Sequence, residues 1–395
     1  MAKKEKIEKV VGDVVTEADD LSRELIRDLN KEMGTRVAYN LGCDESPTHV
    51  KRWISTGSIL LDYAISNRRN GGLPEGRVIE IAGKPSIGKS HIALQVAKTV
   101  QRMGGLVVYI DTENATPVET LGNMGLDVNK RFVYCDTHCT EEVFQIMEST
   151  IVKAKSIVSK DVPILCVWDS IASSSPKAEL EGDYDENSIG LNARVISKSM
   201  RKIIGVIGQN NVTMLCLNQL RTKIGVMHGD PLTTPGGMAV PYHASIRIRL
   251  NGGQHIEDKD KTAIGINVEA SITKNKVSAP FRKAAFSVMF GQGISEHEQI
   301  IDVLRSYCKE NGPMTINGKR YLLEGEGAWK TLLIDDGNGK VILEKKFTKN
   351  SFAQGLIDPL YKPHIDDMLE VALVNTATHV VVPEDIDPET GEVKE

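Results

Sequence analysis

Cysteine, aromatic side chains and long apolar runs are all scarce in this sequence. Aromatic residues make up 5% of the 395 residues, and the six cysteines are scattered along the chain. A small disulfide-stabilised scaffold is therefore excluded, because such domains are short and dense in cysteine. No apolar run approaches the roughly 18 residues of a membrane helix, and the charged N-terminal segment lacks the apolar stretch of a targeting signal. We expect a cytoplasmic protein with no membrane partner.

An excess of positive charge is missing as well. The formal net charge is -5, so nothing attracts nucleic acid to the molecule as a whole, and any such binding depends on local basic patches. Hydrophobic residues at 41% and charged residues at 26% are typical of a globular protein. The length exceeds what one hydrophobic core usually supports, which predicts one large domain with smaller satellites.

A metal site at the closest pair of cysteines is weakly supported. Cys135, His138 and Cys139 lie within one short stretch. A structural zinc site needs a second pair of ligands, which this stretch does not supply. We interpret it as the end of a strand, with a metal site as the alternative.

Apolar runs alternate with helical stretches from residue 77 onwards. The apolar runs are 77–83, 106–113, 163–170 and 212–219, and the helical stretches are 89–104, 143–158 and 194–210. Near-continuous apolar strands alternating with helices predict an α/β fold with a mostly parallel central sheet that is covered on both faces. Three further strand-like runs, 244–250, 263–277 and 282–290, are expected to extend this sheet with antiparallel members.

The pattern divides the chain into four segments. They are an N-terminal helix and linker at 1–48, the α/β core at 49–293, a small α+β domain at 294–382 and an acidic flexible tail at 383–395.

The N-terminal helix has one apolar face. It is expected to end at Gly34, and its apolar residues, which recur every four positions, are Leu21, Leu25, Leu29 and Met33. This face either packs on the chain's own core or docks on a neighbouring subunit, and the pattern favours neither.

The stretch "GKPSIGKS" matches the phosphate-binding pattern G-x-x-x-x-G-K-[ST] in full. Its residues are Gly83, Lys84, Pro85, Ser86, Ile87, Gly88, Lys89 and Ser90. The stretch follows a strand and opens a helix, which is the context that the pattern requires. Backbone N–H groups at such a turn surround a phosphate, the lysine reaches the β- and γ-oxygens, and the serine ligates Mg²⁺. We therefore predict a site for a nucleoside triphosphate.

Acidic residues at two other strand ends complete this site. Asp169 closes the run "PILCVWD", where it can hold Mg²⁺ with Ser90. The run "LVVYIDTE" ends with Asp111 and Glu113, which point the same way if the strand continues through both. We choose Glu113, further along the strand, as the group that orients or deprotonates water.

Longer stretches of the core resemble the RecA recombinase family. They are "WISTGSILLDYAI", "YIDTENA", "WDSIASSSPKAELEGD", "IGLNARVISKSMRKI", "LNQLRTKIGVMHGDPLTTPGGMAV" and "ITKNKVSAPF". The resemblance covers residues 21–294 and includes "TKIGVM" and "APF", which general P-loop proteins do not share. It implies a RecA-type P-loop ATPase core to which the N-terminal helix and the C-terminal domain are added.

The resemblance implies roles for several residues of the core. Glu113 is similar to the family's water-activating glutamate, and Gln219 to the glutamine that senses the γ-phosphate. Lys274 and Lys276 resemble the pair that reaches the ATP of a neighbouring subunit, and residues two apart on a strand share a face. With Lys89, these four residues form the predicted catalytic set.

Two segments are expected to bind DNA. Residues 217–240 form a connection much longer than the roughly 2 to 6 residues usual in such folds, which is typical of a lid, a binding element or a disordered segment. The resemblance makes this the second DNA loop. A basic helix stripe of Arg194, Lys198, Arg201 and Lys202 adjoins the first DNA loop. The candidate contacts are Arg194, Ser197, Lys198, Arg201, Arg221, Lys223, Ile224, His228, Gly236 and Gly237. Glycine suits this role because no Cβ blocks the approach of a DNA backbone.

Two positions depart from the family pattern. Thr120 stands where bacterial members carry a tyrosine that stacks on adenine, which puts the base pocket and the selectivity for ATP in question. His228 stands where they commonly carry phenylalanine.

The resemblance implies a DNA-dependent ATPase that uses ATP and Mg²⁺. Such a protein forms a homo-oligomeric helical filament on single-stranded DNA and pairs it with homologous double-stranded DNA. Loading or mediator proteins and a single-strand-binding protein are further expected partners. The alternatives are a hexameric ring motor similar to a helicase and a DNA-binding paralogue without hydrolysis. The amphipathic N-terminal helix and the paired lysines favour the filament over the ring. The intact Lys89, Ser90, Glu113 and Asp169 argue against the paralogue.

Overall fold

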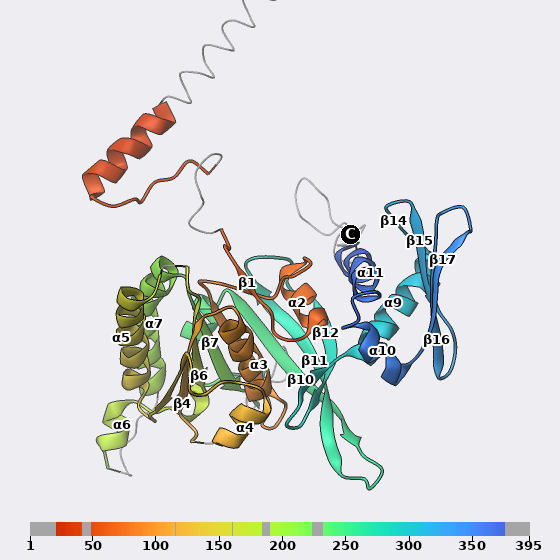
Figure 1. The fold of residues 1–395 in the computed structure, drawn as a ribbon. Coiled ribbons are helices and arrows are strands. Elements are labelled where there is room, and N and C mark those ends of the chain that lie inside the picture. The colour runs from red at the N-terminus through yellow and green to blue at the C-terminus, as the bar shows by residue number, and fades with distance from the viewer. Residues whose placement is uncertain are drawn as a thin grey trace, which may run out of the picture. The chain divides into compact units, whose positions relative to one another are not determined.

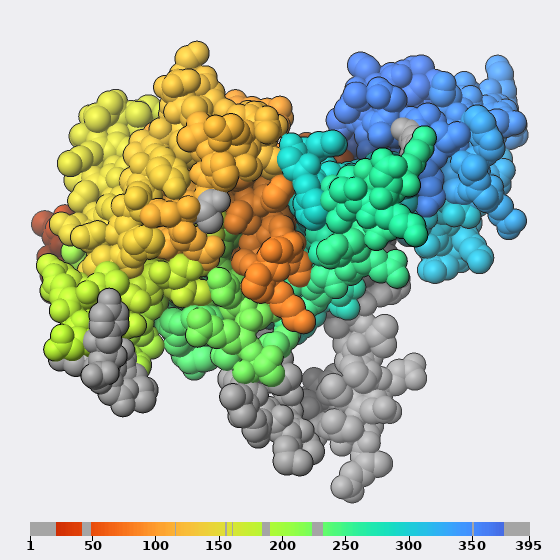
Figure 2. Space-filling view, turned by 90° about the horizontal axis from the view of Figure 1, so that it is seen from below, coloured from red at the N-terminus to blue at the C-terminus, as the bar shows by residue number. Residues whose placement is uncertain are grey.

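The computed structural model describes residues 21–41, 49–114, 116–159, 161–183, 190–222 and 232–375. Its contacts divide the chain into two units, Met1–Lys51 and Arg52–Glu395 (Figure 1). The C-terminal residues of the second unit, coloured blue, form one side of that unit (Figure 2).

The first unit contains a helix over residues 21–33, which confirms the predicted helix. It ends at Gly34, whose φ of 64° lies in the left-handed region that glycine adopts without strain. The side chain of Asn30 accepts hydrogen bonds from the N–H groups of Val37 and Ala38, which ties the following segment back to the helix. The four apolar side chains predicted for one face are between 39% and 67% exposed.

A nine-stranded sheet forms the centre of the second unit. In spatial order its strands are β13 (Gly293–Ser295), β12 (Lys283–Met289), β11 (Ala263–Asn275), β10 (Ile246–Glu257), β3 (Val78–Gly83), β7 (Val212–Gln219), β6 (Ile164–Asp169), β4 (Leu106–Asp111) and β5 (Phe132–Asp136). The strands from β10 to β5 are parallel to one another, which confirms the mostly parallel sheet. The antiparallel extension begins at β11, whereas β10, which was also expected to be antiparallel, runs parallel to β3.

Helices cover both faces of this sheet (Figure 1). One face packs on α2 (Ile59–Ser66) and α3 (Lys89–Arg102), and the other on α5 (Thr140–Ile157) and α7 (Leu191–Asn210). Successive side chains of β4 alternate between the hydrophobic cores on the two faces of the sheet. Val107 and Tyr109 face α3, and Val108 and Ile110 face the opposite side. The phosphate-binding turn is thereby fixed between two buried elements.

Shorter elements complete the core. They are β1 (Trp53–Ile54), β2 (Leu73–Pro74), α4 (Val118–Asn123), η1 (Ile171–Ser173), α6 (Lys177–Glu181), β8 (Arg221–Thr222), β9 (Leu232–Thr233) and α8 (Ala239–His243). Among the described residues, no helix is both long enough and apolar enough to cross a membrane.

The C-terminal part combines helices with an antiparallel sheet, as expected for an α+β domain. Its elements are α9 (His297–Asn311), β14 (Met314–Ile316), β15 (Lys319–Glu324), β16 (Trp329–Asp335), β17 (Val341–Thr348), α10 (Lys349–Gly355) and α11 (Lys362–Asn375). Arg69 of the core forms ion pairs with Asp366, Asp367 and Glu370 of α11. The predicted tail at 383–395 lies outside the described residues.

Candidate nucleotide site and DNA interface

The phosphate-binding turn connects β3 to α3. A Cβ on Gly83 would lie 2.8 Å from Cγ2 of Ile87, so the turn can close this tightly only with glycine. Gly88, the residue before α3, has a φ of 95°, and Ser86 has a φ of 60°. This backbone directs N–H groups toward the start of the helix, where the helix dipole also favours an anion.

Lys89 folds back over the turn. Its Nζ donates to the carbonyl oxygens of Gly83 at 3.2 Å and Lys84 at 2.9 Å. Burial lowers the pKa of Lys89, while the negative charges of Asp169 and Glu113 raise it. A largely buried ammonium group beside two acids is suited to binding a polyphosphate.

Ser90 and Asp169 meet at the carboxyl end of β6. The Ser90 hydroxyl donates to Asp169 Oδ2 at 2.8 Å, and the hydroxyl of buried Tyr109 donates to the same oxygen at 2.5 Å. Burial raises the pKa of Asp169, and these two hydrogen bonds lower it. The donor set of a carboxylate and a hydroxyl fits Mg²⁺, which prefers oxygen ligands and retains several waters.

Asp111 and Glu113 do not share a strand, so the prediction that their side chains point the same way along one strand was wrong. β4 ends at Asp111, and the chain bends before Glu113. The Asp111 carboxylate accepts hydrogen bonds from the N–H groups of Glu113 at 2.9 Å and Thr116 at 3.2 Å, and from the Tyr134 hydroxyl at 3.0 Å. Asp111 therefore organises the turn that presents Glu113.

Glu113 lies where three chain segments meet. Its Oε1 accepts hydrogen bonds from Ser170 Oγ at 2.6 Å, Ser173 Oγ at 2.7 Å and Gln219 Nε2 at 3.3 Å. Gln219 ends β7 directly opposite Gly83, so its predicted position beside the phosphate-binding strand is confirmed. Sequence reasoning missed Ser170 and Ser173, although a run of serines just after the Asp169 strand was the signal available.

These groups line one open pocket of about 580 Å³, a size usual for a small-molecule site. Its lining residues are Pro85, Ser86, Gly88, Lys89, Ser90, His91, Leu94, Asp111, Glu113, Thr116, Pro117, Thr120, Asp169, Gln219 and Phe290. We call it the P-loop pocket. Of the predicted turn residues, Ile87 packs in the core behind it, while Gly83 and Lys84 face Lys89 with their carbonyl groups.

Lys274 and Lys276 do not line the P-loop pocket of their own chain. β11 ends at Asn275, so the two lysines do not share one strand face as the spacing suggested. Lys274 Nζ donates to the carbonyl oxygens of Pro241 and Tyr242, both at 2.8 Å, at the end of α8.

A groove of about 520 Å³ runs between α7 and α8. Arg194, Ser197 and Arg201 of the predicted DNA contacts line it, together with His243. Burial lowers the pKa of His243, and nearby positive charge lowers it further. That charge belongs to Lys276, Arg201 and Lys274. Lys274 lies beside the groove, because its Nζ binds the carbonyl oxygen of Tyr242, which is a lining residue.

Not every residue of the basic stripe on α7 faces this groove. Lys202 forms an ion pair with Glu148 of α5, with its Nζ 2.6 Å from the carboxylate, and so turns away from α8. Lys198 is exposed but lies outside the groove lining. Of the basic stripe, Arg194 and Arg201 therefore face α8, and Ser197 lies with them in the groove lining.

Comparison with known proteins decides the family. The family model described as the RecA N-terminal domain matches residues 21–295. The chain belongs to the RecA family. It is 35% identical to Protein RecA of Sulfurimonas denitrificans over 86% of this chain and 95% of that protein. It is 38% identical to Protein RecA of Bacteroides thetaiotaomicron over 70% of this chain and 79% of that protein.

In this RecA-family chain, both ends of the second predicted DNA loop lie within the described residues. Arg221 is exposed in β8, which pairs with β9. Lys223, Ile224 and His228 lie outside the described residues.

Gly236 and Gly237 lie after β9 and have φ values of 88° and 72°. A Cβ on Gly236 would lie 2.9 Å from Ile171, and one on Gly237 would lie 2.8 Å from Ala193. The structure thus supplies a reason for these glycines beyond access to DNA, because the loop packs closely against η1 and α7.

The lining of the P-loop pocket includes an aromatic side chain that the sequence did not indicate. Thr120 lines the pocket from α4, and Leu94, Pro117 and Phe290 supply apolar surface there. Phe290 follows β12 and is 44% exposed. In this RecA-family chain, an aromatic ring therefore lies at the pocket despite the threonine at position 120.

Proposed function

We propose that the P-loop pocket of this chain binds ATP with Mg²⁺ and powers the pairing of homologous DNA. As a member of the RecA family, the chain is a DNA-dependent ATPase of recombination and repair. The observation that carries the site assignment is the convergence of Lys89, Ser90, Glu113, Asp169 and Gln219 on one pocket. They come from four separate segments, namely the start of α3, the turn after β4, the end of β6 and the end of β7, so their meeting is not a consequence of local sequence.

Each of these residues has a chemical task in the proposed reaction. The turn and Lys89 hold the β- and γ-phosphates, and Ser90 with Asp169 holds Mg²⁺, whose charge offsets that of the phosphates. Glu113, fixed by Ser170 and Ser173, orients a water and accepts its proton.

Gln219 connects this reaction to the second DNA loop. Its side-chain amide donates to Glu113, and its backbone leads into β8 at the start of the loop. A γ-phosphate that accepts the same N–H group competes with Glu113 for Gln219. Nucleotide binding thus alters the position from which the loop departs.

The groove between α7 and α8 is the proposed path of single-stranded DNA. Arg194 and Arg201 contact phosphates there, Ser197 adds a hydroxyl, and the end of the second loop adjoins the groove at Met238. Each phosphate neutralised lowers log K by roughly 0.7 per unit of log salt concentration on single strands.

We further propose that the chain works as a helical homo-oligomer in the cytoplasm. Lys274 and Lys276 act on the ATP of a neighbouring subunit, which is supported by their place outside their own P-loop pocket. The segment 1–48 docks on the neighbour through its exposed apolar face. Mediator proteins, which load the chain onto DNA, and a single-strand-binding protein are its further proposed partners.

Exchanging Leu25 and Leu29 for Ser together is expected to abolish assembly, because it removes two apolar side chains from this face. Assembly is measured by sedimentation with single-stranded DNA and a slowly hydrolysed ATP analogue. Lys31→Ser, on the same helix, is the control that assembles normally. Normal assembly of the double variant would show that the helix covers its own core instead.

The proposed function is tested by measuring ATP hydrolysis with and without single-stranded DNA, followed by pairing with a homologous duplex. We expect hydrolysis to require the DNA and pairing to require homology. Hydrolysis coupled to the unwinding of duplex DNA, with no pairing, would instead support the ring motor.

A further inference from the structure

A carboxylate is buried in the strand that leads to the phosphate-binding turn. Glu80 lies in β3, three positions before Gly83, and none of its surface is exposed. It accepts hydrogen bonds from Arg247 Nε of β10 at 2.5 Å and from Asn218 Nδ2 of β7 at 2.9 Å. An ionised group in a central strand is tolerated only when it is paired in this way. The neighbouring strands on both sides of β3 are thus joined through one side chain.

Asn218 is the centre of this network. Its Oδ1 accepts a hydrogen bond from the N–H of Gln219 at 3.0 Å. Its Nδ2 donates both to Glu80 and to the carbonyl oxygen of Pro235 at 3.1 Å. One fully buried amide therefore contacts the proposed γ-phosphate sensor, the phosphate-binding strand and the far end of the second DNA loop.

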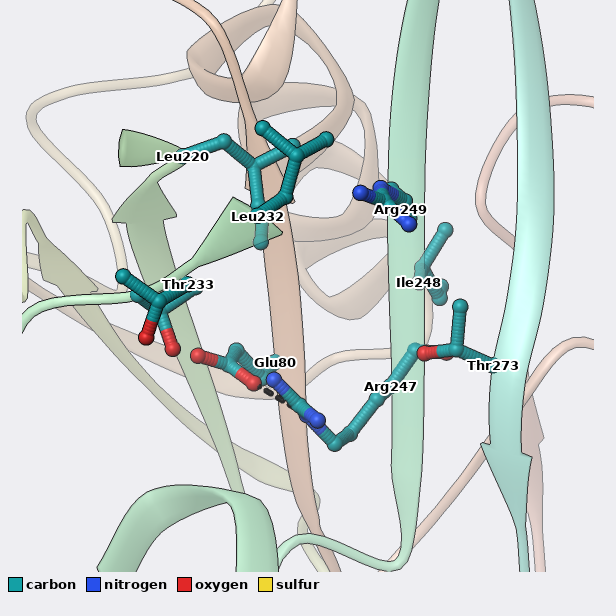
Figure 3. Close-up of a pocket in the computed structure, with 10 residues that line it drawn as sticks. Glu80, Leu220, Leu232, Thr233, Arg247, Ile248, Arg249 and Thr273 are labelled. Atoms are coloured by element: carbon teal, nitrogen blue, oxygen red, sulfur yellow. Dashed lines mark hydrogen bonds and ion pairs between the residues drawn. The ribbon is translucent and has the colours of Figure 1, made fainter. Parts of the chain in front are cut away.

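The network continues on the other side of β3. Arg247 is paired in register with Lys274 on β11, and the Thr273 hydroxyl donates to the carbonyl oxygen of Arg247 at 3.3 Å. A second pocket, separate from the P-loop pocket, lies beside this network and is lined by Glu80, Thr233 and Arg247. Figure 3 shows the ion pair of Arg247 with Glu80 in this pocket, together with Thr233 at the end of β9. The pocket has a volume of about 100 Å³, so the part of the loop next to the network is not tightly packed against β10.

The loop is held again immediately after Pro235. Gly236 and Gly237 pack against Ile171 and Ala193 at distances that leave no room for a Cβ. Ile171 begins η1, the same short helix whose Ser173 binds Glu113. The returning end of the loop is therefore fixed to the same structural elements as the predicted catalytic glutamate.

We propose that Asn218 is a positioning residue that couples the nucleotide in the P-loop pocket to the grip of the second loop on DNA. The proposal rests on the proposed function and adds a second connection to that through Gln219. Because Asn218 binds the backbone of Gln219 and that of Pro235, a shift at the start of the loop moves its returning end as well. Buried hydrogen bonds resist breaking, since each broken bond leaves an unsatisfied group.

The test compares DNA affinity in two nucleotide states. Binding of a fluorescent oligothymidylate is measured with Mg²⁺ and a slowly hydrolysed ATP analogue, and again with Mg²⁺ and ADP. The ratio of the two affinities is the coupling factor. For Asn218→Ala we expect this ratio to fall about tenfold, while the affinity for fluorescent ADP stays within about twofold of the wild type.

Thr213→Val is the matched control. Thr213 is buried in the same strand, and its hydroxyl has no hydrogen-bond partner among the described residues. The control is expected to keep the wild-type ratio. Cooperative melting followed by circular dichroism checks the fold of each variant, and Asn218→Ser carries the same expectation if Asn218→Ala fails to fold. A hydroxyl on a shorter side chain cannot reach both Glu80 and Pro235.

The outcomes separate this proposal from the one on which it rests. A wild-type coupling factor of one would refute nucleotide-controlled DNA binding, and the role of Asn218 with it. A wild-type factor that is retained in the folded Asn218 variants would refute the role of Asn218 alone. If the coupling factor fell equally in Thr213→Val, the role of Asn218 would also be refuted, because the effect would then be a general consequence of altering β7.

Discussion

Glu113→Gln is expected to slow ATP hydrolysis about 10²- to 10⁴-fold, the range associated with loss of a general base. Glutamine keeps the size of the side chain and an oxygen that accepts the hydrogen bonds of Ser170 and Ser173. It cannot take a proton from water. Nucleotide affinity should therefore remain close to that of the wild type while turnover falls, which single-turnover hydrolysis and fluorescent ADP binding measure separately.

Glu119→Gln is the control for this substitution. Glu119 is exposed on α4, six positions further along, and does not line the P-loop pocket. It should hydrolyse ATP at the normal rate. If Glu113→Gln does the same, the water is activated by another group, and Asp111, which lines the same pocket and binds the backbone of Glu113, is the candidate.

Lys89→Ala is expected to weaken ATP binding and to slow hydrolysis by about 10²- to 10³-fold, as when one preorganised charge is removed from a reaction centre. The ammonium group is the largest positive charge that lines the P-loop pocket, and alanine leaves the phosphates facing Glu113 and Asp169. Equilibrium binding of ATP and steady-state hydrolysis test the two effects.

Lys98→Ala removes an equal charge from the same helix, outside the P-loop pocket. It should bind and hydrolyse ATP as the wild type does. Normal hydrolysis by Lys89→Ala would overturn the assignment of the phosphate site.

The sequence predicted best where a function depends on local spacing. The phosphate-binding turn is one continuous segment, so its pattern and its strand-to-helix context indicated Lys89 and Ser90 directly. The predicted parallel sheet also follows from local patterns, since each buried strand is a continuous apolar run. Of the edge strand β5, only the end near Cys135 was anticipated, because its side chains are half-buried or exposed and form no continuous apolar run.

Contacts between distant segments could not be read in the same way. The alternation rule failed at Asp111 because it holds only within a strand, and the strand ends there. The partners of Glu113 come from η1 and β7, whose approach depends on the order of strands in the sheet. Glu80 was a further signal that was missed, since a charge inside an apolar strand breaks the local pattern and is expected to have a special role.

Electron microscopy of the full chain with single-stranded DNA, Mg²⁺ and a slowly hydrolysed ATP analogue tests the central claim most directly. The account predicts continuous helical filaments that follow the DNA and shorten or disappear when ADP replaces the analogue. Closed hexameric rings, with no filament on DNA, would contradict it.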